Sequence, residues 1–301
     1  MAEYIEKSYA GLGTVNQFKL WGHNAEKTLE KIVKYLYNVE QRMSYFIDSS
    51  EISSINKSAG INYVRVSEDT FYVIKKAKEY AEITNGLFDI TSRPLSDLWS
   101  MNDKIPNNYS IDKSLELVNW EDILLKPNTK EVMLARLGQK IDLGAIGKGF
   151  IADEIVKIIK CDKISAAIVN LGGDVFIYGN KPDNTLFEVG LQDPFSEYGE
   201  SITKVKVKNR AVATSGIYER YNEKVGQKAH HIIDPRIGHP VINNIVSATV
   251  AAKTTMEADV YATAILIMGI QDCKEFLKKV KDIKVFIITQ DKQIHIFGNN
   301  L

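Results

Sequence analysis

The segment 164–179, ISAAIVNLGGDVFIYG, constrains the fold of this chain more than any other. It contains two runs rich in β-branched and aromatic residues, joined by Gly172 and Gly173. Two such runs on either side of a glycine pair predict two strands and a tight turn. Similar runs predict further strands at residues 17–20, 202–214, 229–234, 245–252, 285–290 and 293–297.

Apolar residues at helical spacing occupy fewer segments. One follows Asn24 and extends to Met43, and another begins at the natural cap Ser67 and ends at Asn85-Gly86. Further helices are predicted at residues 147–160, 255–268 and 272–280. Strands outnumber helices and short turns often join them, so we expect an α+β fold with a mixed, mostly antiparallel sheet packed with helices. No G-x-G-x-x-G follows a strand, so a Rossmann site is not expected.

Composition excludes several classes of function. The 301 residues include 38 Lys and Arg against 38 Asp and Glu, so the charge does not indicate binding to nucleic acid or an anionic membrane. Cys161 and Cys273 form neither a CxxC motif nor a disulfide framework. The N-terminal residues lack the pattern of a signal peptide, and no run has the roughly 18 to 20 apolar residues of a membrane span. We expect a single domain over residues 1–301 located in the cytoplasm; the alternative is an extracytoplasmic lipoprotein whose signal segment has been removed.

A glycine-rich corner at residues 141–155, IDLGAIGKGFIADEI, runs directly into a predicted helix. Glycine permits close backbone approach, and a helix N-terminus offers N–H groups and positive potential to a phosphate. The P-loop pattern fails because Gly149 follows Lys148. Two interpretations stay open, a phosphate cradle or a strand-to-helix corner with a solvated lysine.

Three other stretches combine turn residues with polar groups. Residues 170–179 are explained by a hairpin without any ligand. ATSGIYERY, residues 213–221, places Thr214, Ser215 and Gly216 at the end of a strand, where an ST turn is the alternative to a ligand-binding loop. In HHIIDPRIGHP, residues 230–240, successive histidines point to opposite faces of a strand. One of them could act as a general base or orient a phosphate, and the alternative is a hydrogen-bonded structural histidine.

Asp259 and Thr263 lie four residues apart in an otherwise apolar segment, TTMEADVYATAIL. In an α-helix this spacing puts both side chains on one face. An N-cap at Asp259 and a back-bonded Thr263 would account for the pair. The alternative is an oxygen-only site for Mg²⁺, completed by a backbone carbonyl from the glycine-rich corner, where a metal and a nucleotide phosphate would meet.

Eight segments of the chain resemble, in the same order, those of the ApbE-type FAD:protein FMN transferases, also called flavin-trafficking proteins. The resemblance spans almost the whole chain. The segments are GLGT, RMSYFIDSSEISSIN, NGLFDIT with PLSDLW, IDLGAIGKGFIADEI, NLGGDV, ATSGIYERY, HHIIDPRIG and EADVYATAILIMG.

The resemblance implies a set of site residues. Asp259 and Thr263 resemble the Mg²⁺ ligands of the family, with the backbone carbonyl of Ala145 as a third ligand. His231 is the candidate for handling a proton or orienting a phosphate, with Asp259 as the other catalytic residue. The positions implied to bind FAD are Leu12, Phe46, Leu87, Phe88, Asp89, Asp142, Lys148, Thr214, Ser215, Gly216 and His231.

Three positions depart from the family pattern. Leu12 replaces the usual methionine, and Phe46 stands where a tyrosine neighbours the flavin. Both residues are large and apolar, so stacking on a flavin survives while a tyrosine hydroxyl contact is lost. Ile237 replaces a threonine in the turn after Asp234, which removes a hydroxyl there.

The reaction implied by the resemblance is Mg²⁺-dependent transfer of the FMN half of FAD to a threonine or serine hydroxyl of an acceptor flavoprotein, with release of AMP. The expected partners are therefore FAD, Mg²⁺ and that flavoprotein. Two alternatives use the same site: a Mg²⁺-dependent FAD pyrophosphatase that yields FMN and AMP, and a non-catalytic FAD-binding protein.

Overall fold

A computed structural model describes residues 4–101, 104–197, 199–218 and 230–298 of the chain. The helices are α1 (Ala25–Met43), α2 (Glu51–Lys57), α3 (Glu68–Ile83), α4 (Arg93–Met101), α5 (Asn108–Leu115), α6 (Gly147–Cys161) and α7 (Thr255–Lys279), with short 3-10 helices at Ile90–Ser92 and Trp120–Asp122. The strands are β1 (Tyr4–Gly11), β2 (Thr14–Trp21), β3 (Val64–Arg65), β4 (Ile123–Lys126), β5 (Glu131–Leu134), β6 (Ala166–Leu171), β7 (Asp174–Tyr178), β8 (Phe187–Gln192), β9 (Ser201–Val207), β10 (Arg210–Gly216), β11 (Ile233–Asp234), β12 (His239–Pro240), β13 (Ile245–Ala252), β14 (Lys284–Thr289) and β15 (Ile294–Gly298).

The main sheet of the described residues has eight strands in the order β1-β2-β6-β7-β10-β13-β14-β15. Each neighbouring pair in it is antiparallel. The predicted hairpin at Gly172 and Gly173 joins β6 to β7, and both glycines have positive φ. The expected α+β fold with a mostly antiparallel sheet is confirmed.

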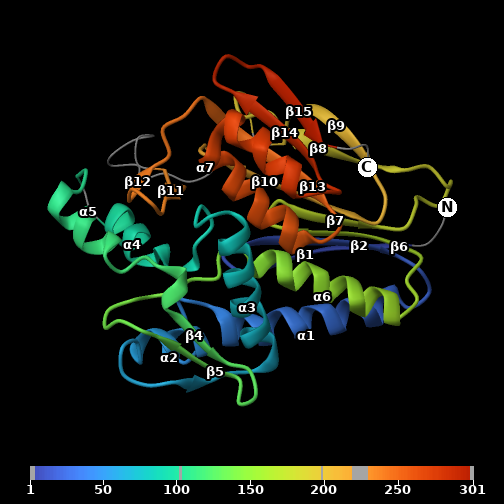
Figure 1. The fold of residues 1–301 in the computed structure, drawn as a ribbon. Helices are drawn as coiled ribbons and strands as arrows, with labels where there is room; N and C mark the ends of the chain where they lie inside the picture. Colours follow the sequence, from blue (N-terminus) through green and yellow to red (C-terminus); the bar gives the residue numbers. More distant parts are fainter. Residues whose placement is uncertain (1–3, 102–103, 198, 219–229, 299–301) are drawn as a thin grey trace.

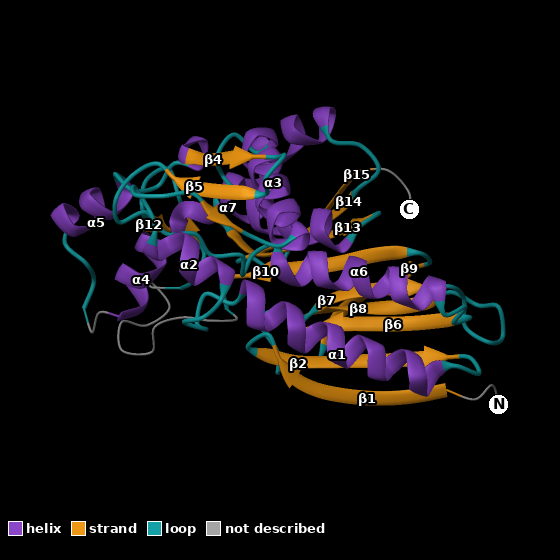
Figure 2. Cartoon of the chain, turned by 90° about the horizontal axis from the view of Figure 1, so that it is seen from below, coloured by secondary structure: helices purple, strands orange, loops and turns teal. Residues whose placement is uncertain are grey.

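One face of the main sheet is covered by α1, α6 and α7. Figures 1 and 2 show α1 and α6 side by side under the first strands, while α7 packs on β10 and β13 and against α6. Side chains alternate between the two faces of a strand, and Ala211 and Ala213 of β10 belong to the core under the helices. Val212 between them points to the other face, where the β8–β9 hairpin forms a second apolar cluster with Trp21 and Phe286.

A smaller set of elements lies at the left and lower left of Figure 1, beside the main sheet. The three-stranded sheet β3-β5-β4 packs near α2 and α3, and α4, α5, β11 and β12 form the left end of Figure 1. Leu95, Trp99, Ile111 and Ile233 make a separate core there. The Trp99 indole donates a hydrogen bond to Gly238 O at 2.8 Å, which attaches the β11–β12 turn to α4.

The two helices expected at residues 255–268 and 272–280 both lie within α7, and Gly269, whose φ of 83° is not helical, forms the break between them. Two predicted strands differ from the structure. The segment expected as one strand at residues 202–214 is divided into β9 and β10, which belong to different sheets. The strand expected at residues 229–234 is reduced to Ile233–Asp234, and Ala229 lies outside the described residues. Strands β1, β3, β4, β5, β8 and β12 and helices α2, α4 and α5 were not predicted.

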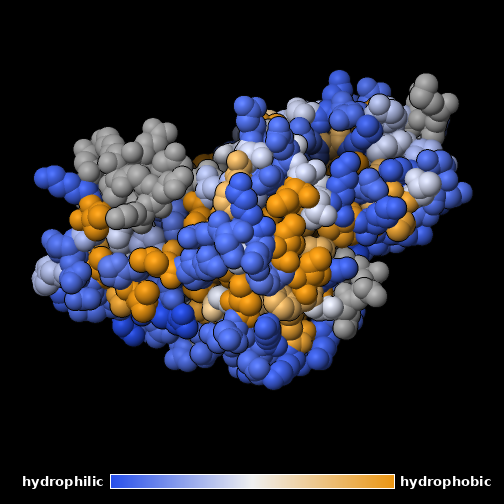
Figure 3. Space-filling view, turned by 90° about the horizontal axis from the view of Figure 1, so that it is seen from above, coloured by the Kyte–Doolittle hydropathy of each residue, from blue (hydrophilic) through white to orange (hydrophobic). Residues whose placement is uncertain are grey.

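No helix within the described ranges combines the length and apolar character needed to cross a bilayer. The surface seen from above is mainly hydrophilic, with apolar side chains gathered in a central band (Figure 3).

Candidate active site

Asp259 lies in the second turn of α7 and does not cap that helix. Thr254 is the N-cap residue, and its hydroxyl accepts a hydrogen bond from a first-turn amide at 3.2 Å. Asp153 of α6 binds the same helix end, because its carboxylate accepts hydrogen bonds from the Thr255 and Met256 amides at 2.7 and 3.1 Å. The capping interpretation of Asp259 is therefore wrong, and its buried carboxylate is available for another role.

Gly149 brings α6 and α7 into direct contact. A Cβ at this position would lie 2.6 Å from Met256 Cα and 2.8 Å from Thr255 O, so only glycine fits. The Gly149 amide also lowers the pKa of the Asp259 carboxylate. The N-cap residue Ile146 provides no side-chain cap, which leaves the N-terminus of α6 suited to an anion.

Lys148 lies between two buried carboxylates. Its Nζ is 2.6 Å from Asp174 Oδ2 and 3.7 Å from Asp259 Oδ2. Neither of these oxygens accepts a hydrogen bond of regular geometry from the described residues, so the ammonium group compensates their charge. The interpretation of Lys148 as a solvated corner lysine is therefore wrong.

Burial is the main cause that raises the pKa of Asp259 well above its ordinary value, and the neighbouring Asp174 acts in the same direction. Lys148 and the Gly149 amide lower the pKa of Asp259 and offset part of this effect. When all three side chains are ionised, two carboxylates and one ammonium group carry one negative charge in excess. A further cation beside Asp259 would stabilise that ionised state.

Thr263 extends the same face of α7 by one turn. Its hydroxyl oxygen lies 2.9 Å from Ser215 Oγ of β10, and Ser215 is buried. The contact joins two of the predicted site segments that are far apart in the sequence. Asp259, Thr263 and Ser215 thus supply oxygen atoms where α7 packs on the end of β10.

The end of β10 carries further hydroxyl groups beside Ser215. Thr214 Oγ1 lies 2.8 Å from Thr249 Oγ1 of β13. Gly216 pairs with Ser247, whose buried hydroxyl has no hydrogen-bond partner among the described residues. A Cβ on Gly216 would lie 2.4 Å from the Tyr218 ring, so glycine makes room for that ring.

The turn between β1 and β2 lies against the turn between β6 and β7. Leu12 and Gly13 have φ values of 56° and 69°, as a type I′ hairpin turn requires. The Leu12 amide donates a hydrogen bond to Glu40 Oε1 at 2.6 Å. A Cβ on Gly172 would lie 2.6 Å from Thr14 Oγ1, so the two turns touch.

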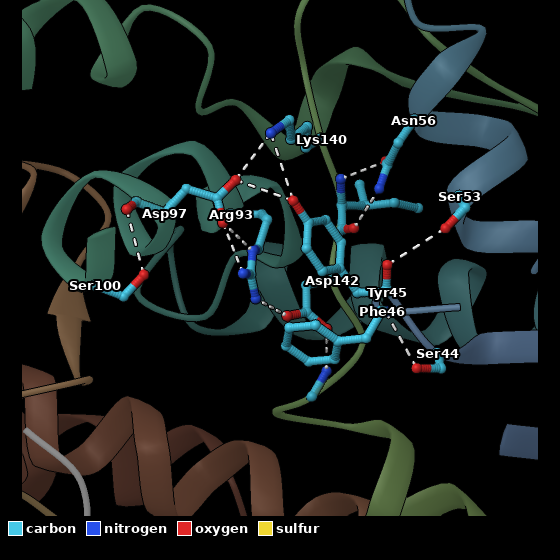
Figure 4. A network of polar contacts seen from close by, with 12 residues as sticks. Ser44, Tyr45, Phe46, Ser53, Asn56, Arg93, Asp97, Ser100, Lys140 and Asp142 are labelled. Atoms are coloured by element: carbon cyan, nitrogen blue, oxygen red, sulfur yellow. Dashed lines mark hydrogen bonds and ion pairs between the residues drawn. The ribbon is translucent and has the colours of Figure 1, made fainter. Parts of the chain in front are cut away.

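A second polar group surrounds Asp142 (Figure 4). Asp142 Oδ2 accepts a hydrogen bond from Arg93 Nη1 at 2.8 Å, and Oδ1 accepts one from the Gly144 amide at 2.9 Å. Arg93 also forms an ion pair with Asp97. Phe46 lies beside this group and is 79% exposed.

Leu87, Phe88 and Asp89 precede the Arg93 segment and are buried. The first two side chains belong to the main core, which leaves the backbone as the part that can face a ligand. Asp89 Oδ1 accepts hydrogen bonds from Thr91, and Oδ2 accepts one from the Trp120 amide. Burial raises the pKa of Asp89 to about 6 despite these bonds.

The two histidines occupy different environments. His230 is buried, its Nε2 lies 3.0 Å from Val241 O, and its Nδ1 accepts a hydrogen bond from the Ile232 amide. Burial lowers the pKa of His230, so this residue fits the structural interpretation. His231 is exposed on the segment that leads into β11.

The predicted residues therefore fall into two groups. The first consists of two contact pairs, Lys148 with Asp259 and Ser215 with Thr263, which the shared face of α7 links, and the second is centred on Asp142. The loop that contains Ala145 runs from Asp142 to the start of α6 and so connects the two groups. The contacts described above do not join Leu87, Phe88 or Asp89 to the first group.

Sequence reasoning missed two residues. Asp174 was covered by the hairpin interpretation of residues 170–179, and only the packing of α6 on β7 brings it to Lys148. Arg93 falls between the NGLFDIT and PLSDLW segments and was not considered. Its i, i+4 spacing to Asp97 at the start of a helix was the one signal that could have identified it.

The donor set around Asp259 fits a hard divalent cation better than zinc. It offers carboxylate and hydroxyl oxygens, and the buried Asp259 and Asp174 outnumber the one cation, Lys148, that pairs with them. No group of three or more His, Cys, Asp or Glu side chains suited to a metal occurs in the described part of the chain. A magnesium ion does not need such a group, because it usually keeps several waters and substrate oxygens.

Comparison with solved structures identifies the class of fold. The crystal structure of the ApbE protein of Thermotoga maritima superposes with a TM-score of 0.88 at 29% identity, covering 97% of this chain and 96% of that one. The flavin transferase ApbE of Vibrio cholerae also gives a TM-score of 0.88, at 25% identity, covering 100% of this chain and 98% of that one. The fold is that of the ApbE flavin transferases.

Sequence comparison identifies the family. The model of the ApbE family matches residues 12–287, and the chain therefore belongs to this family and is an enzyme. A FAD:protein FMN transferase of Klebsiella pneumoniae is 29% identical over 286 residues, covering 94% of this chain and 88% of the relative. A FAD:protein FMN transferase of Treponema pallidum is 30% identical over 284 residues, covering 88% of this chain and 78% of the relative. The resemblance inferred from the eight segments is confirmed.

Proposed function

We propose that the chain transfers the FMN moiety of FAD to a threonine or serine hydroxyl of a target flavoprotein in a Mg²⁺-dependent reaction that releases AMP. The observation that carries this proposal is the placement of Asp259 and Thr263 on one face of α7, against Lys148 and Ser215. The names of the relatives support the choice of FAD and a protein acceptor. The charge and oxygen content of the site support an enzyme that acts on a pyrophosphate.

Each group of residues has a separate role in the proposal. Asp259, Thr263 and the Ala145 carbonyl hold Mg²⁺, which when bound neutralises charge on the pyrophosphate. Lys148 and the N-terminus of α6 attract phosphate oxygens. Leu12, Phe46, the 87–89 backbone, Asp142 and residues 214–216 line the FAD site.

The transfer requires a proton acceptor as well as charge neutralisation. The acceptor hydroxyl forms a bond to the phosphorus of the FMN half, and the bond from that phosphorus to the AMP oxygen breaks. The hydroxyl proton must leave during this step. We assign the role of proton acceptor to His231, because this residue is exposed and an imidazole can take up a proton near neutral pH.

The test incubates the chain with FAD, Mg²⁺ and a candidate flavoprotein, and follows covalent flavin by in-gel fluorescence and mass spectrometry. We expect an added mass of FMN less water on a threonine or serine of the acceptor, with one AMP released for each label. Chelation of the metal and Asp259→Asn should both abolish the label. Asp282→Asn is the matched control, because Asp282 is exposed and forms its ion pair with Lys253, outside the candidate site.

Two outcomes would replace the proposal. Release of FMN and AMP without labelling of any acceptor would make the chain a FAD pyrophosphatase. FAD binding without turnover, and with an unchanged affinity in Asp259→Asn, would make it a FAD-binding protein without catalytic activity.

A further inference from the structure

Arg93 connects two carboxylates and an aromatic ring at the edge of the candidate FAD site (Figure 4). Its Nε donates a hydrogen bond to Asp97 Oδ1 at 2.7 Å, and its Nη1 donates one to Asp142 Oδ2 at 2.8 Å. The guanidinium carbon lies 3.8 Å from the centre of the Tyr45 ring. Hydrogen bonds from two sides of the guanidinium group and an aromatic ring on its face fix its plane.

The same group of residues is neutral overall and largely enclosed. Lys140 Nζ lies 2.9 Å from Asp97 Oδ2, and the Tyr45 hydroxyl donates a hydrogen bond to the same oxygen at 3.0 Å. Two cations therefore balance the carboxylates of Asp97 and Asp142. The Arg93 side chain is 12% exposed, so loss of its charge would leave Asp142 without its cationic partner and Asp97 with Lys140 as its remaining cation.

Asp142 retains the capacity to bind a ligand. One of its oxygens is bound by Arg93 and the other by the Gly144 amide, which leaves further lone pairs on each. Its side chain is 27% exposed, more than that of Asp97 at 11%. FAD offers N–H and O–H donors in its two ring systems and its sugar groups, and a carboxylate held in one orientation suits them.

Phe46 presents an exposed apolar ring at the same place. Its ring packs edge-on against Tyr45, with 5.3 Å between centroids, and its centroid is 5.2 Å from the Arg93 guanidinium. A ring that is 79% exposed yet packed against two neighbours offers its free surface to a planar ligand ring. Arg93 therefore touches both the polar and the apolar part of this surface.

We propose that Arg93 is a positioning residue for FAD, which fixes the orientation of the Asp142 carboxylate toward the ligand. The inference rests on the proposed function, because FAD is its ligand. Arg93 itself need not touch FAD. Its effect passes through Asp142, and the energetic coupling of the two residues is the signature that separates this role from a purely structural one.

The experiment measures FAD affinity of the full chain by flavin fluorescence, in the presence of Mg²⁺ and without acceptor. We expect Arg93→Gln to weaken FAD binding by about tenfold or more. Arg93→Lys should recover part of the loss, because lysine keeps the positive charge but lacks the planar guanidinium group that donates hydrogen bonds to two carboxylates. With acceptor present, KM for FAD should rise while kcat at saturating FAD changes little. Arg42→Gln is the matched control, since it breaks the partly buried ion pair between Arg42 and Asp69, neither of which belongs to the group around Arg93.

The double variant Arg93→Gln/Asp142→Asn provides the decisive comparison. If Arg93 acts through Asp142, the double variant binds FAD no more weakly than Asp142→Asn alone. The inference would be overturned if the losses of FAD affinity of the two single variants multiplied in the double variant. It would also be overturned if Arg93→Gln were less stable but bound FAD like the wild type. If the wild type binds FAD but labels no acceptor, the proposed transfer is wrong, while the test of Arg93 by FAD affinity still applies.

Discussion

Gly149 and Met256 approach so closely that no side chain fits between their backbones, with a Cβ on Gly149 placed 2.6 Å from Met256 Cα. This contact holds the start of α6, which carries Lys148, against the start of α7, which carries Asp259. Gly149→Ala should therefore separate the two helix ends. We expect a loss of about 1 to 3 kcal/mol in the free energy of unfolding, measured by urea denaturation, together with weaker Mg²⁺ binding.

The control for this prediction lies two residues away. A Cβ on Gly147 would meet only Leu143 Cβ at 3.7 Å, an ordinary contact, so Gly147→Ala should leave both properties nearly unchanged. Equal effects of the two substitutions would mean that helix propensity, and not the contact with Met256, determines the result.

Lys148 compensates the Asp174 and Asp259 carboxylates, so it should compete with a metal for the same negative charge. We predict that Lys148→Met lowers the melting temperature in the presence of a chelator and increases the stabilisation produced by added Mg²⁺. Asp174→Asn should have the opposite effect on Mg²⁺ stabilisation, because it removes one negative charge. Thermal unfolding over a series of Mg²⁺ concentrations measures both effects.

Lys157→Met is the control for the lysine substitution, since Lys157 pairs with Glu154 at a more exposed place on the same helix. A smaller Mg²⁺ stabilisation in Lys148→Met than in the wild type would contradict the competition and would instead assign the lysine a supporting role in metal binding.

The elements of the fold were predictable where local pattern and tertiary structure agree. The Gly172-Gly173 turn, the Ser67 cap and the helical face of Asp259 and Thr263 depend on residues within a few positions of one another. Strand β8 was not predicted, because its apolar side chains pack only on one face of the main sheet and are interrupted by Glu188 and Gly190. Its position depends on a partner layer that local periodicity does not show.

The candidate site was predictable in part for the same reason. The i, i+4 pair on α7 and the glycine-rich corner identified Asp259, Thr263 and Lys148, and the family resemblance added their proposed roles. Asp174 and Arg93 could not be found in this way. Their decisive partners, Lys148 and Asp142, are distant in sequence and are brought near only by helix packing on the sheet.

Asp89 should make stability depend on pH. Burial raises its pKa to about 6 in the folded chain, above the value of about 4 expected for an unfolded aspartate, so the folded state binds this proton more tightly. Its contribution is fully present below about pH 4 and is lost as pH rises through about 6. We predict that the wild type gains about 1 to 3 kcal/mol relative to Asp89→Asn between pH 7 and pH 4.5, as measured by urea unfolding at several pH values. Asp282→Asn, at an exposed carboxylate with a lowered pKa, should show no such trend.

Thr263 has two roles to separate, since its hydroxyl both bonds to Ser215 and points with Asp259 along α7. Thr263→Val keeps the shape of the side chain and removes the oxygen, so we predict loss of Mg²⁺ binding and a destabilisation of about 1 to 2 kcal/mol from the unpaired Ser215 hydroxyl. Ser215→Ala should cost similar stability but keep Mg²⁺ binding, and Thr263→Ser should keep both. Isothermal titration with Mg²⁺ and urea unfolding of the three variants measure the two effects independently. If Thr263→Val binds Mg²⁺ as the wild type does, Thr263 is not a metal ligand, and its hydroxyl serves only to join α7 to β10.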